Sequence, residues 1–232
     1  MVYNFFTSVL FLFFSFNGTN SPANNTAIST PVEKTAVTET ESLYNTISAH
    51  TTSMPTMACF EKAIKGYNLL KAQGKIQRHL LTVIDFSRSS NTKRLWIIDM
   101  DLQAVVYNTL VAHGRNSGDE YAKSFSNTNS SNMSSLGFYA TGELYNGKHG
   151  QSLKLDGLEN GLNSNARTRG VVMHAADYVS ETFIKLHHRL GRSQGCPALP
   201  SGITKEVINL IKGKSCLFIY HPEYDRESKI LS

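Results

Sequence analysis

The stretch from Val171 to Pro200, VVMHAADYVSETFIKLHHRLGRSQGCPALP, carries most of the information in this chain. A short apolar run over residues 170–173 predicts a buried strand, and His174 follows directly at its end. Further on, Cys196 stands in the turn-like sequence Ser193-Gln194-Gly195-Cys196-Pro197. A thiol on a glycine-containing turn, with a histidine to act as base, is the minimal set of groups for covalent acyl transfer. The stretch therefore predicts thiol chemistry beside a sheet.

The residue types alone leave a second interpretation open. A buried cysteine behaves as a small hydrophobic residue, and a histidine at a strand end can be a core residue with satisfied hydrogen bonds. From spacing alone the two interpretations of Cys196 and His174 stand about level.

The remainder of the chain predicts a mostly β body with a few helices, an α+β class. Alternating and apolar runs predict strands, and apolar residues at helical spacing predict helices. The predicted strands are 79–86, 94–100, 103–112, 137–140, 152–155, 170–173 and 215–221, and the predicted helices are 60–74, 179–191 and 203–211, the last with Ser201 as its N-cap. No repeat of 20–50 residues interrupts this single domain.

Between the third and fourth predicted strands, residues 114–135 consist almost entirely of glycine, serine, asparagine and charged residues. A loop of this length in a compact domain is often functional. His113 and Arg115 lie where the preceding strand enters it.

The N-terminal part divides into two segments before this body. Residues 1–16 contain an apolar run, Phe5 to Phe16, that is too short to span a bilayer and predicts an export signal. An uncleaved anchor or a buried segment is the alternative. Residues 17–56 are rich in serine and threonine and predict a flexible tether. The predicted catalytic body then covers residues 57–232.

Composition narrows the class of function. The 232 residues carry a net charge of +5, and the tether is acidic, so the body is more basic than the whole. Basicity favours acidic partners, but no nucleic-acid-binding signature accompanies it. The chain has three cysteines, too few for a disulfide scaffold. Cys59 and Cys216 either pair in an oxidising compartment or remain buried free thiols.

Metal binding is not expected. His187 and His188 are adjacent on a predicted helix, so they point to different faces and lack the i,i+4 spacing of helical metal ligands. We predict neither a metal nor a cofactor.

The motif His174 … Ser193-Gln194-Gly195-Cys196 resembles that of the L,D-transpeptidase catalytic domain family (YkuD-type), a His followed after a gap by Ser-x-Gly-Cys. The resemblance extends from about Leu81 to Tyr220. Further segments that look like the bacterial murein branch are 111–118 (VAHGRNSG), 125–127 (FSN), 134–139 (SSLGFY), 149–150 (HG) and 172–179 (VMHAADYV).

The resemblance implies an antiparallel β fold with a cleft over the catalytic cysteine. It implies that Cys196 is the nucleophile and His174 the general base and acid. Gly195 and the Cys196 backbone N–H would contribute to the oxyanion hole, and Ser193 would brace the turn. One position departs from the pattern: the family usually has Arg or Asn two residues after the cysteine, where this chain has Ala198.

Three further residues are candidates for substrate binding. Arg115 could hold a substrate carboxylate, with an exposed loop arginine as the alternative. His149 lies in a glycine-rich turn and is a weaker candidate of the same kind. Tyr139 resembles a family position lining the cleft, although a buried strand tyrosine is equally compatible. Asp177 either orients His174 or, as we prefer, caps the following helix.

Together these features predict an exported enzyme of the periplasm or cell envelope that forms an acyl-enzyme with peptidoglycan stem peptides. Transfer to an amine would make a 3-3 cross-link, and transfer to water would make the same site an L,D-carboxypeptidase. The resemblance also implies reaction with carbapenem-type inhibitors. A thiol peptidase for other peptides and a non-catalytic envelope-binding module are the alternatives. No nucleic acid and no stable membrane insertion after processing are expected.

Overall fold

The computed structural model describes Met1, residues 38–148 and residues 150–226. The predicted export signal and the first part of the predicted tether lie outside these residues, and so does His149. Within the described part, no helix has both the length and the apolar character needed to cross a membrane.

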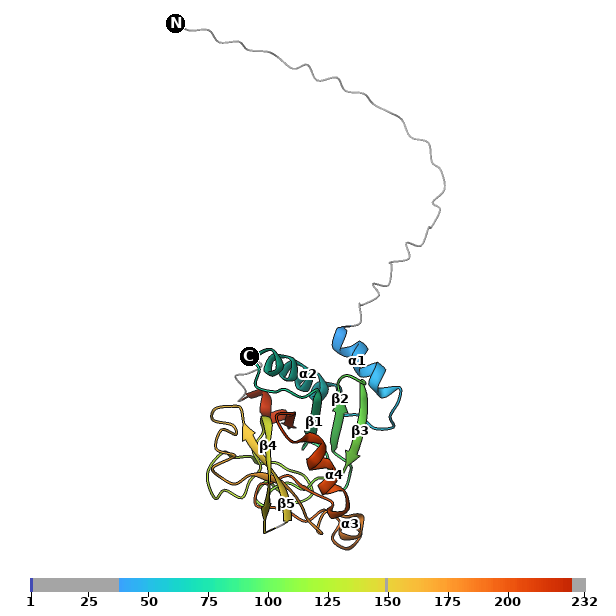
Figure 1. The fold of residues 1–232 in the computed structure, drawn as a ribbon, viewed down its shortest axis with the longest axis vertical. Coiled ribbons are helices and arrows are strands. Elements are labelled where there is room, and N and C mark those ends of the chain that lie inside the picture. The colour runs from blue at the N-terminus through green and yellow to red at the C-terminus, as the bar shows by residue number, and fades with distance from the viewer. Residues whose placement is uncertain (2–37, 149, 227–232) are drawn as a thin grey trace, which may run out of the picture. The chain divides into compact units, whose positions relative to one another are not determined.

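The described residues form one eight-stranded sheet with helices packed around it (Figure 1). The strand order is β3-β2-β1-β8-β4-β5-β6-β7, and only the pairs β1–β8 and β6–β7 are parallel. The strands are β1 (Leu80–Asp85), β2 (Leu95–Asp99), β3 (Ala104–Thr109), β4 (Gly137–Gly147), β5 (Gly150–Gly157), β6 (Val172–Ala175), β7 (Ala198–Leu199) and β8 (Cys216–Tyr220). This confirms the predicted mostly β class.

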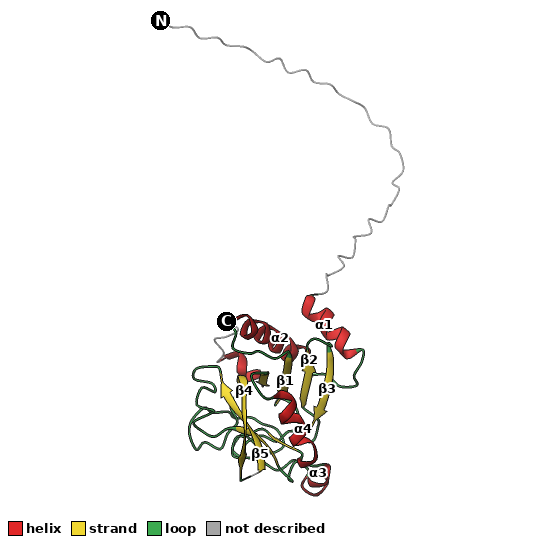
Figure 2. Cartoon of the chain, in the orientation of Figure 1, coloured by secondary structure: helices red, strands yellow, loops and turns green. Residues whose placement is uncertain are grey.

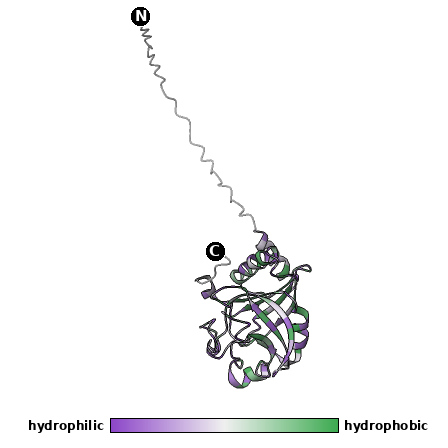
Figure 3. Ribbon diagram, turned by 60° about the vertical axis from the view of Figure 1, so that its left-hand side comes forward, coloured by the Kyte–Doolittle hydropathy of each residue, from purple (hydrophilic) through white to green (hydrophobic). Residues whose placement is uncertain are grey.

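Four α-helices and one short 3₁₀ helix complete the described fold (Figure 2). The helices are α1 (Glu39–Ser48), α2 (Met57–Ala72), α3 (Glu181–His187), α4 (Ser201–Ile211) and η1 (Pro222–Arg226). Helix α2 packs on β1 and β8, whereas α4 packs on β4, β5 and β6. Hydrophobic colouring concentrates on these strands and helices, and the loops are mostly hydrophilic (Figure 3).

The two ends of the sheet meet near the predicted nucleophile. Ala112, just after β3, bridges Ala198 of β7, and its N–H donates to the Ala198 carbonyl at 2.9 Å. A second bridge joins Gly114 to Ser193. We call these two bridges the seam. Because of the seam, the turn that carries Cys196 is bonded on one side to the segment that follows β3, and on the other it continues into β7; these are the two edge strands of the sheet.

The core between α2 and the sheet is packed at contact distance. Phe138 of β4 stacks on Phe218 of β8, with ring centroids 4.2 Å apart. Gly66 of α2 lies directly over Phe138, where an added Cβ would come within 2.0 Å of the ring. Only glycine permits this approach, so α2 sits closer to the sheet than a helix with side chains on that face could.

Helix α1 lies within the segment that the sequence predicts to be a flexible tether. Thr38 and Glu41 form a capping box at its start. Ile47 is fully buried in the main core, and Leu43 and Tyr44 pack against it. The physical reason for the difference is tertiary: a few apolar residues suffice to order a short helix when a core is present to receive them.

Ile47→Ala tests whether α1 belongs to the folded body. Since Ile47 is fully buried, its truncation should lower the free energy of unfolding by about 2–5 kcal/mol. Chemical denaturation measures the loss. Asn45→Ala, on an exposed position of the same helix, is the matched control and should change stability little. An Ile47→Ala variant as stable as the control would mean that α1 adds nothing to the fold.

Two predicted helix starts are wrong in detail. Ser201 is the first residue of α4 rather than its cap; the N-cap is Pro200, which makes no side-chain capping bond. The Ser201 hydroxyl instead donates to Asp177 Oδ1 at 2.7 Å. Helix α3 begins after Ser180, whose hydroxyl accepts from the Phe183 N–H. The preferred capping role of Asp177 is therefore filled by Ser180.

Candidate active site

Cys196 lies on a tight turn that the Ser193 side chain braces. The Ser193 hydroxyl donates to the Cys196 carbonyl at 2.6 Å and accepts from the Gly195 N–H at 3.0 Å. The Ser193 backbone is held in turn at the seam, where its N–H donates to the His113 carbonyl and its carbonyl accepts from the Arg115 N–H. These bonds fix the turn on both sides of the thiol.

Both the backbone conformation and the close packing at position 195 require a glycine. Its φ is +120°, a region that favours glycine. An added Cβ would come within 2.7 Å of the Met133 carbonyl oxygen. Since the Gly195 N–H is already donated to Ser193, Gly195 contributes the shape of the turn. No hydrogen bond of the Cys196 N–H to any described residue is found, so this donor is available for an oxyanion.

His174 is placed beside this turn by the parallel pairing of β6 with β7, in which His174 lies opposite Ala198. Val172 and Cys196 lie two residues before His174 and Ala198, and the Val172 backbone nitrogen is 3.4 Å from Cys196 Sγ. The ring of His174 is almost completely buried, and its Nδ1 lies 2.9 Å from the Ala175 carbonyl oxygen. An Nδ1–H donated to that carbonyl would leave Nε2 as the basic nitrogen.

Cys196, His174 and Ser193 line one cavity of about 740 Å³. Its walls come from the long loop, the end of the β4–β5 hairpin, the segment before β6 and the cysteine turn. The other lining residues are Arg115, Asn129, Ser130, Asn132, Tyr145, Lys148, Thr168, Arg169, Gly170, Val171, Val172, Tyr178, Arg192 and Gln194.

The cavity is strongly basic. Its lining includes the cations Arg115, Lys148, Arg169 and Arg192, and no aspartate or glutamate among the described lining residues. Arg192 forms an ion pair with Asp119 outside the lining, at 2.6 Å. A cavity with this excess of positive charge favours a ligand that carries carboxylates.

The surroundings of Cys196 act on its thiol in opposite directions. Burial raises the pKa of the thiol above its ordinary value, whereas the Val172 N–H and the positive charges of Arg169 and Lys148 lower it. Burial is the largest effect, so the resting group is the protonated thiol at neutral pH. Attack on a carbonyl therefore needs a base, and His174 is the imidazole in the same cavity.

Arg169 is a site residue that the sequence analysis did not single out. Its guanidinium donates to the carbonyls of Ser126 and Met133, both at 2.8 Å, and to the Ser131 hydroxyl at 3.1 Å; it also bonds the Ser135 hydroxyl. Arg169 thus fastens the long loop over the cysteine turn. A basic pair at 167 and 169, directly before the strand that carries His174, was the available signal.

Removing the charge of Arg169 should raise the pKa of the Cys196 thiol further, because one of the effects that lower it is lost. We expect Arg169→Gln to alkylate with iodoacetamide more slowly at pH 7 and to shift the alkylation profile to higher pH. Arg169→Lys keeps the charge without the fork of donors and should alkylate at nearly the native rate. Equal profiles for Arg169→Gln and the native protein would contradict this account.

Of the other residues predicted to bind substrate, one lines the cavity and one does not. Arg115 is exposed and lines the cavity, as its proposed role requires. Tyr139 does not: it is fully buried on β4 and donates its hydroxyl to the Ser135 carbonyl at 2.9 Å. Its assignment to the cleft wall is wrong, since both faces of β4 are buried over residues 137–141 and its side chain lies in the core. Asp177 accepts from Ser201, and the polar contact found for the His174 Nδ1 is the Ala175 carbonyl.

The other described residues that the sequence analysis discussed lie outside the lining of the cavity. Cys59 and Cys216 are both free and buried. His188 ends α3 in the left-handed conformation, and the ring of His187 packs on Phe183. No cluster of three or more potential metal ligands occurs among the described residues. Ala198, at the position of the family departure, is buried in a small cluster with Leu110, Ala112, Ala176, Val179 and Leu190.

The fold and site define a class: a β protein with a cysteine and a histidine in a basic cavity. A family model described as L,D-transpeptidase catalytic domain matches residues 51–220. The chain belongs to this family.

Solved structures similar to this chain include L,D-transpeptidases of three bacteria. One from Mycobacterium smegmatis is 10% identical, with a TM-score of 0.39 over 62% of this chain and 59% of that one. One from Xylanimonas cellulosilytica is 13% identical, with a TM-score of 0.36 over 62% and 61%. L,D-transpeptidase 3 from Mycobacterium tuberculosis, in complex with a faropenem-derived adduct, is 10% identical, with a TM-score of 0.40 over 62% and 60%.

The chain thus spans about three fifths of the length of these structures. No curated protein matches it.

Proposed function

We propose that this protein is a peptidoglycan L,D-transpeptidase in which Cys196 is the nucleophile and His174 the general base and acid. The observation that carries the proposal is the basic cavity in which the braced thiol and the buried imidazole lie together. Peptidoglycan stem peptides carry carboxylates, so their charge is complementary to that of the cavity.

In the first step His174 takes the proton of the Cys196 thiol, and the sulfur attacks the carbonyl carbon of an L-centre in the donor stem. The Cys196 N–H donates to the oxyanion of the tetrahedral intermediate. When the intermediate collapses, the C–N bond breaks and His174 returns the proton to the leaving amine of the terminal D-residue. The product is a thioester between the stem peptide and Cys196.

In the second step an amine of another stem attacks the thioester carbonyl. His174 takes a proton from this amine, the C–S bond breaks, and Cys196 regains its proton. The new amide is a 3-3 cross-link. When water replaces the amine, the same sequence releases the shortened stem as a free acid, which is L,D-carboxypeptidase activity.

Arg115 is proposed to hold the donor, and a second cation of the cavity, Arg169, has a different role. Arg115 is exposed at the cavity wall, and its fork of donors suits a stem carboxylate. Most N–H groups of the Arg169 guanidinium already donate to the long loop. Its role is therefore mainly to hold that loop and to lower the pKa of the Cys196 thiol. His149 lies outside the described residues and stays a sequence-based candidate.

The proposed place of action is the cell envelope. The substrate is a polymer outside the cytoplasm, and residues 1–16 carry the sequence pattern of an export signal. Residues 17 to 37 would then link this signal to the folded body, which includes α1. Mass analysis of the N-terminus of the protein from its native envelope tests the cleavage.

Incubation with purified tetrapeptide muropeptides, followed by mass analysis of the products, tests the function directly. Cross-linked dimers that have lost one terminal D-residue support transpeptidation, and shortened monomers support the carboxypeptidase. Unchanged muropeptides, with protein-derived peptides cleaved instead, would overturn the proposal in favour of another thiol peptidase. No product from either substrate would favour a non-catalytic envelope-binding module.

Intact-mass measurement with a carbapenem provides an independent test of the nucleophile. The protein should gain the mass of one inhibitor molecule, and peptide mapping should place it on Cys196. An adduct on Cys59 or Cys216 would contradict the assignment; both are buried and should not react in the folded protein.

A further inference from the structure

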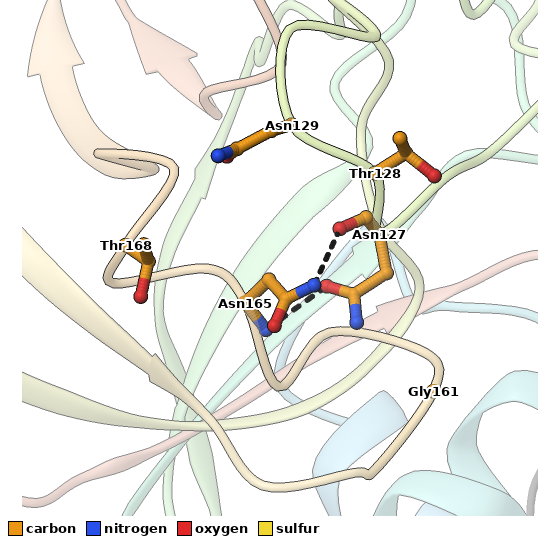
Figure 4. A pocket seen from close by; sticks show the side chains of 6 residues that line it. All are labelled: Asn127, Thr128, Asn129, Gly161, Asn165 and Thr168. Atoms are coloured by element: carbon orange, nitrogen blue, oxygen red, sulfur yellow. Dashed lines mark hydrogen bonds between the residues drawn. The ribbon is translucent and has the colours of Figure 1, made fainter.

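A second cavity, of about 430 Å³, adjoins the catalytic one and shares Asn129 and Thr168 with it. Its remaining lining residues are Asn127, Thr128, Gly161 and Asn165. They come from two loops, the long loop before β4 and the loop between β5 and β6, which face each other in Figure 4. We call this cavity the asparagine pocket.

The chemistry of the asparagine pocket differs from that of the catalytic cavity. Every side chain in its lining is an amide or a hydroxyl, and none is ionisable. Its neighbour carries four cations. A carboxylate-bearing peptide would therefore bind in the catalytic cavity, whereas the asparagine pocket suits an uncharged ligand rich in hydroxyl and amide groups.

The floor of the asparagine pocket is held in place by its own side chains. The Asn165 N–H donates to Asn127 Oδ1 at 3.0 Å, and Asn165 Nδ2 donates to the Asn127 carbonyl at 3.1 Å (Figure 4). Asn127 Nδ2 in turn donates to the Ser164 hydroxyl at 3.2 Å. These bonds join the two loops without using the side chains of Asn129 and Thr168.

Those two side chains are free to bind a ligand. Neither the Asn129 amide nor the Thr168 hydroxyl makes a hydrogen bond to another described residue. Both are exposed, on facing loops at the boundary between the two cavities. A ligand held by them can therefore be covalently continuous with a peptide in the catalytic cavity.

We propose that the asparagine pocket binds an N-acetylated amino sugar of the glycan strand to which the stem peptide is attached. This inference rests on the proposed function, which puts the stem in the adjoining cavity. Sugar hydroxyls and an acetamido group match amide and hydroxyl partners, each of which can both donate and accept. The exposure of Thr128, Gly161 and Asn165 leaves the pocket open, so a polymer can continue beyond it.

The test compares two substrates of the full chain: a tetrapeptide stem alone, and the same stem attached to its N-acetylglucosamine–N-acetylmuramic acid disaccharide. We expect kcat/KM to be roughly fivefold or more higher for the disaccharide substrate, the gain from one or two added hydrogen bonds. The double variant Asn129→Ala/Thr168→Ala should bring the ratio of the two kcat/KM values close to one.

The ratio separates sugar binding from general damage, since a misfolded variant loses both activities together and keeps the ratio. Asn68→Ala, at an exposed asparagine of α2, is the matched control and should keep the native ratio. A native ratio of one, or a ratio that the double variant leaves unchanged, would overturn the proposal. Loss of activity on both substrates at an unchanged ratio, in a double variant whose thermal denaturation is native, would overturn the proposal and show that the pocket binds peptide.

A second measurement keeps the two proposals distinguishable. Titration of the ¹⁵N-labelled protein with the disaccharide alone should shift the amide signals of residues 127–129 and 161–168. If stems are not processed but these shifts occur, the proposed function fails and the sugar site stands. If stems are processed with no shifts and no difference between substrates, the sugar site fails and the proposed function stands.

Discussion

Cys196→Ala should lose essentially all acyl transfer, roughly 10⁴-fold or more in kcat, while the protein remains folded. The physical reason is that the variant has no atom that can form the thioester, and the oxyanion donor and the cations of the cavity stabilise only a reaction that the sulfur begins. Product formation from tetrapeptide muropeptides measures the loss, and circular dichroism with thermal denaturation checks the fold.

Two variants sharpen the result. Cys196→Ser keeps a nucleophilic atom, but a hydroxyl needs stronger activation than a thiol, so it should be nearly as inactive as alanine. Cys59→Ala removes a buried thiol of α2 away from the cavity and should retain activity. If Cys196→Ala still forms cross-links and Cys59→Ala does not, the nucleophile is Cys59 and the assignment to Cys196 is wrong.

His174→Gln should lower kcat/KM by roughly 10²–10⁴-fold, the usual contribution of a positioned acid and base. The burial of Cys196 raises the pKa of its thiol, so without a base the sulfur stays protonated at neutral pH. Activity of the variant should therefore rise towards high pH, where hydroxide removes the thiol proton. Steady-state kinetics over a range of pH measures both effects.

His187→Gln is the matched control, because this histidine is exposed at the end of α3 and does not line the cavity. It should behave as the native protein does. Alkylation of Cys196 in the His174→Gln variant verifies that the thiol is still present and accessible. Native kinetics in His174→Gln would exclude the imidazole as base and require another proton acceptor for Cys196.

Much of the fold followed from local sequence patterns. The seven runs that predicted strands became β1, β2, β3, β4, β5, β6 and β8, because residues such as Leu81 and Phe218 alternate or cluster as buried strands do. The short β7 and helix α1 did not follow. Ala198–Leu199 is too short to carry a periodic signal, and α1 is ordered by the core that Ile47 enters.

For the site residues too, local sequence predicted what local bonds determine, and it missed what tertiary contacts determine. The motif residues Ser193, Gly195 and Cys196 form a turn whose bonds are local, so the sequence was informative there. Lys148 reaches the cavity from the distant end of the β4–β5 hairpin, and no local pattern reveals which loops the sheet brings together. The assignment of Tyr139 rested on resemblance to a family position lining the cleft, and the alternative of a buried strand tyrosine holds, because β4 is buried on both faces at this point.

The seam has a consequence for how the protein acquires its reactive centre during folding. Contacts between residues far apart along a chain add stability only after the entropy of closing the loop between them has been lost, so they slow folding. The bridges from Ala112 to Ala198 and from Gly114 to Ser193 are contacts of this kind, and they hold the turn that carries Cys196. In a newly made chain the segment around Cys196 therefore lacks this support, and the thiol is held beside His174 only after these long-range bridges and the β6–β7 pairing have formed.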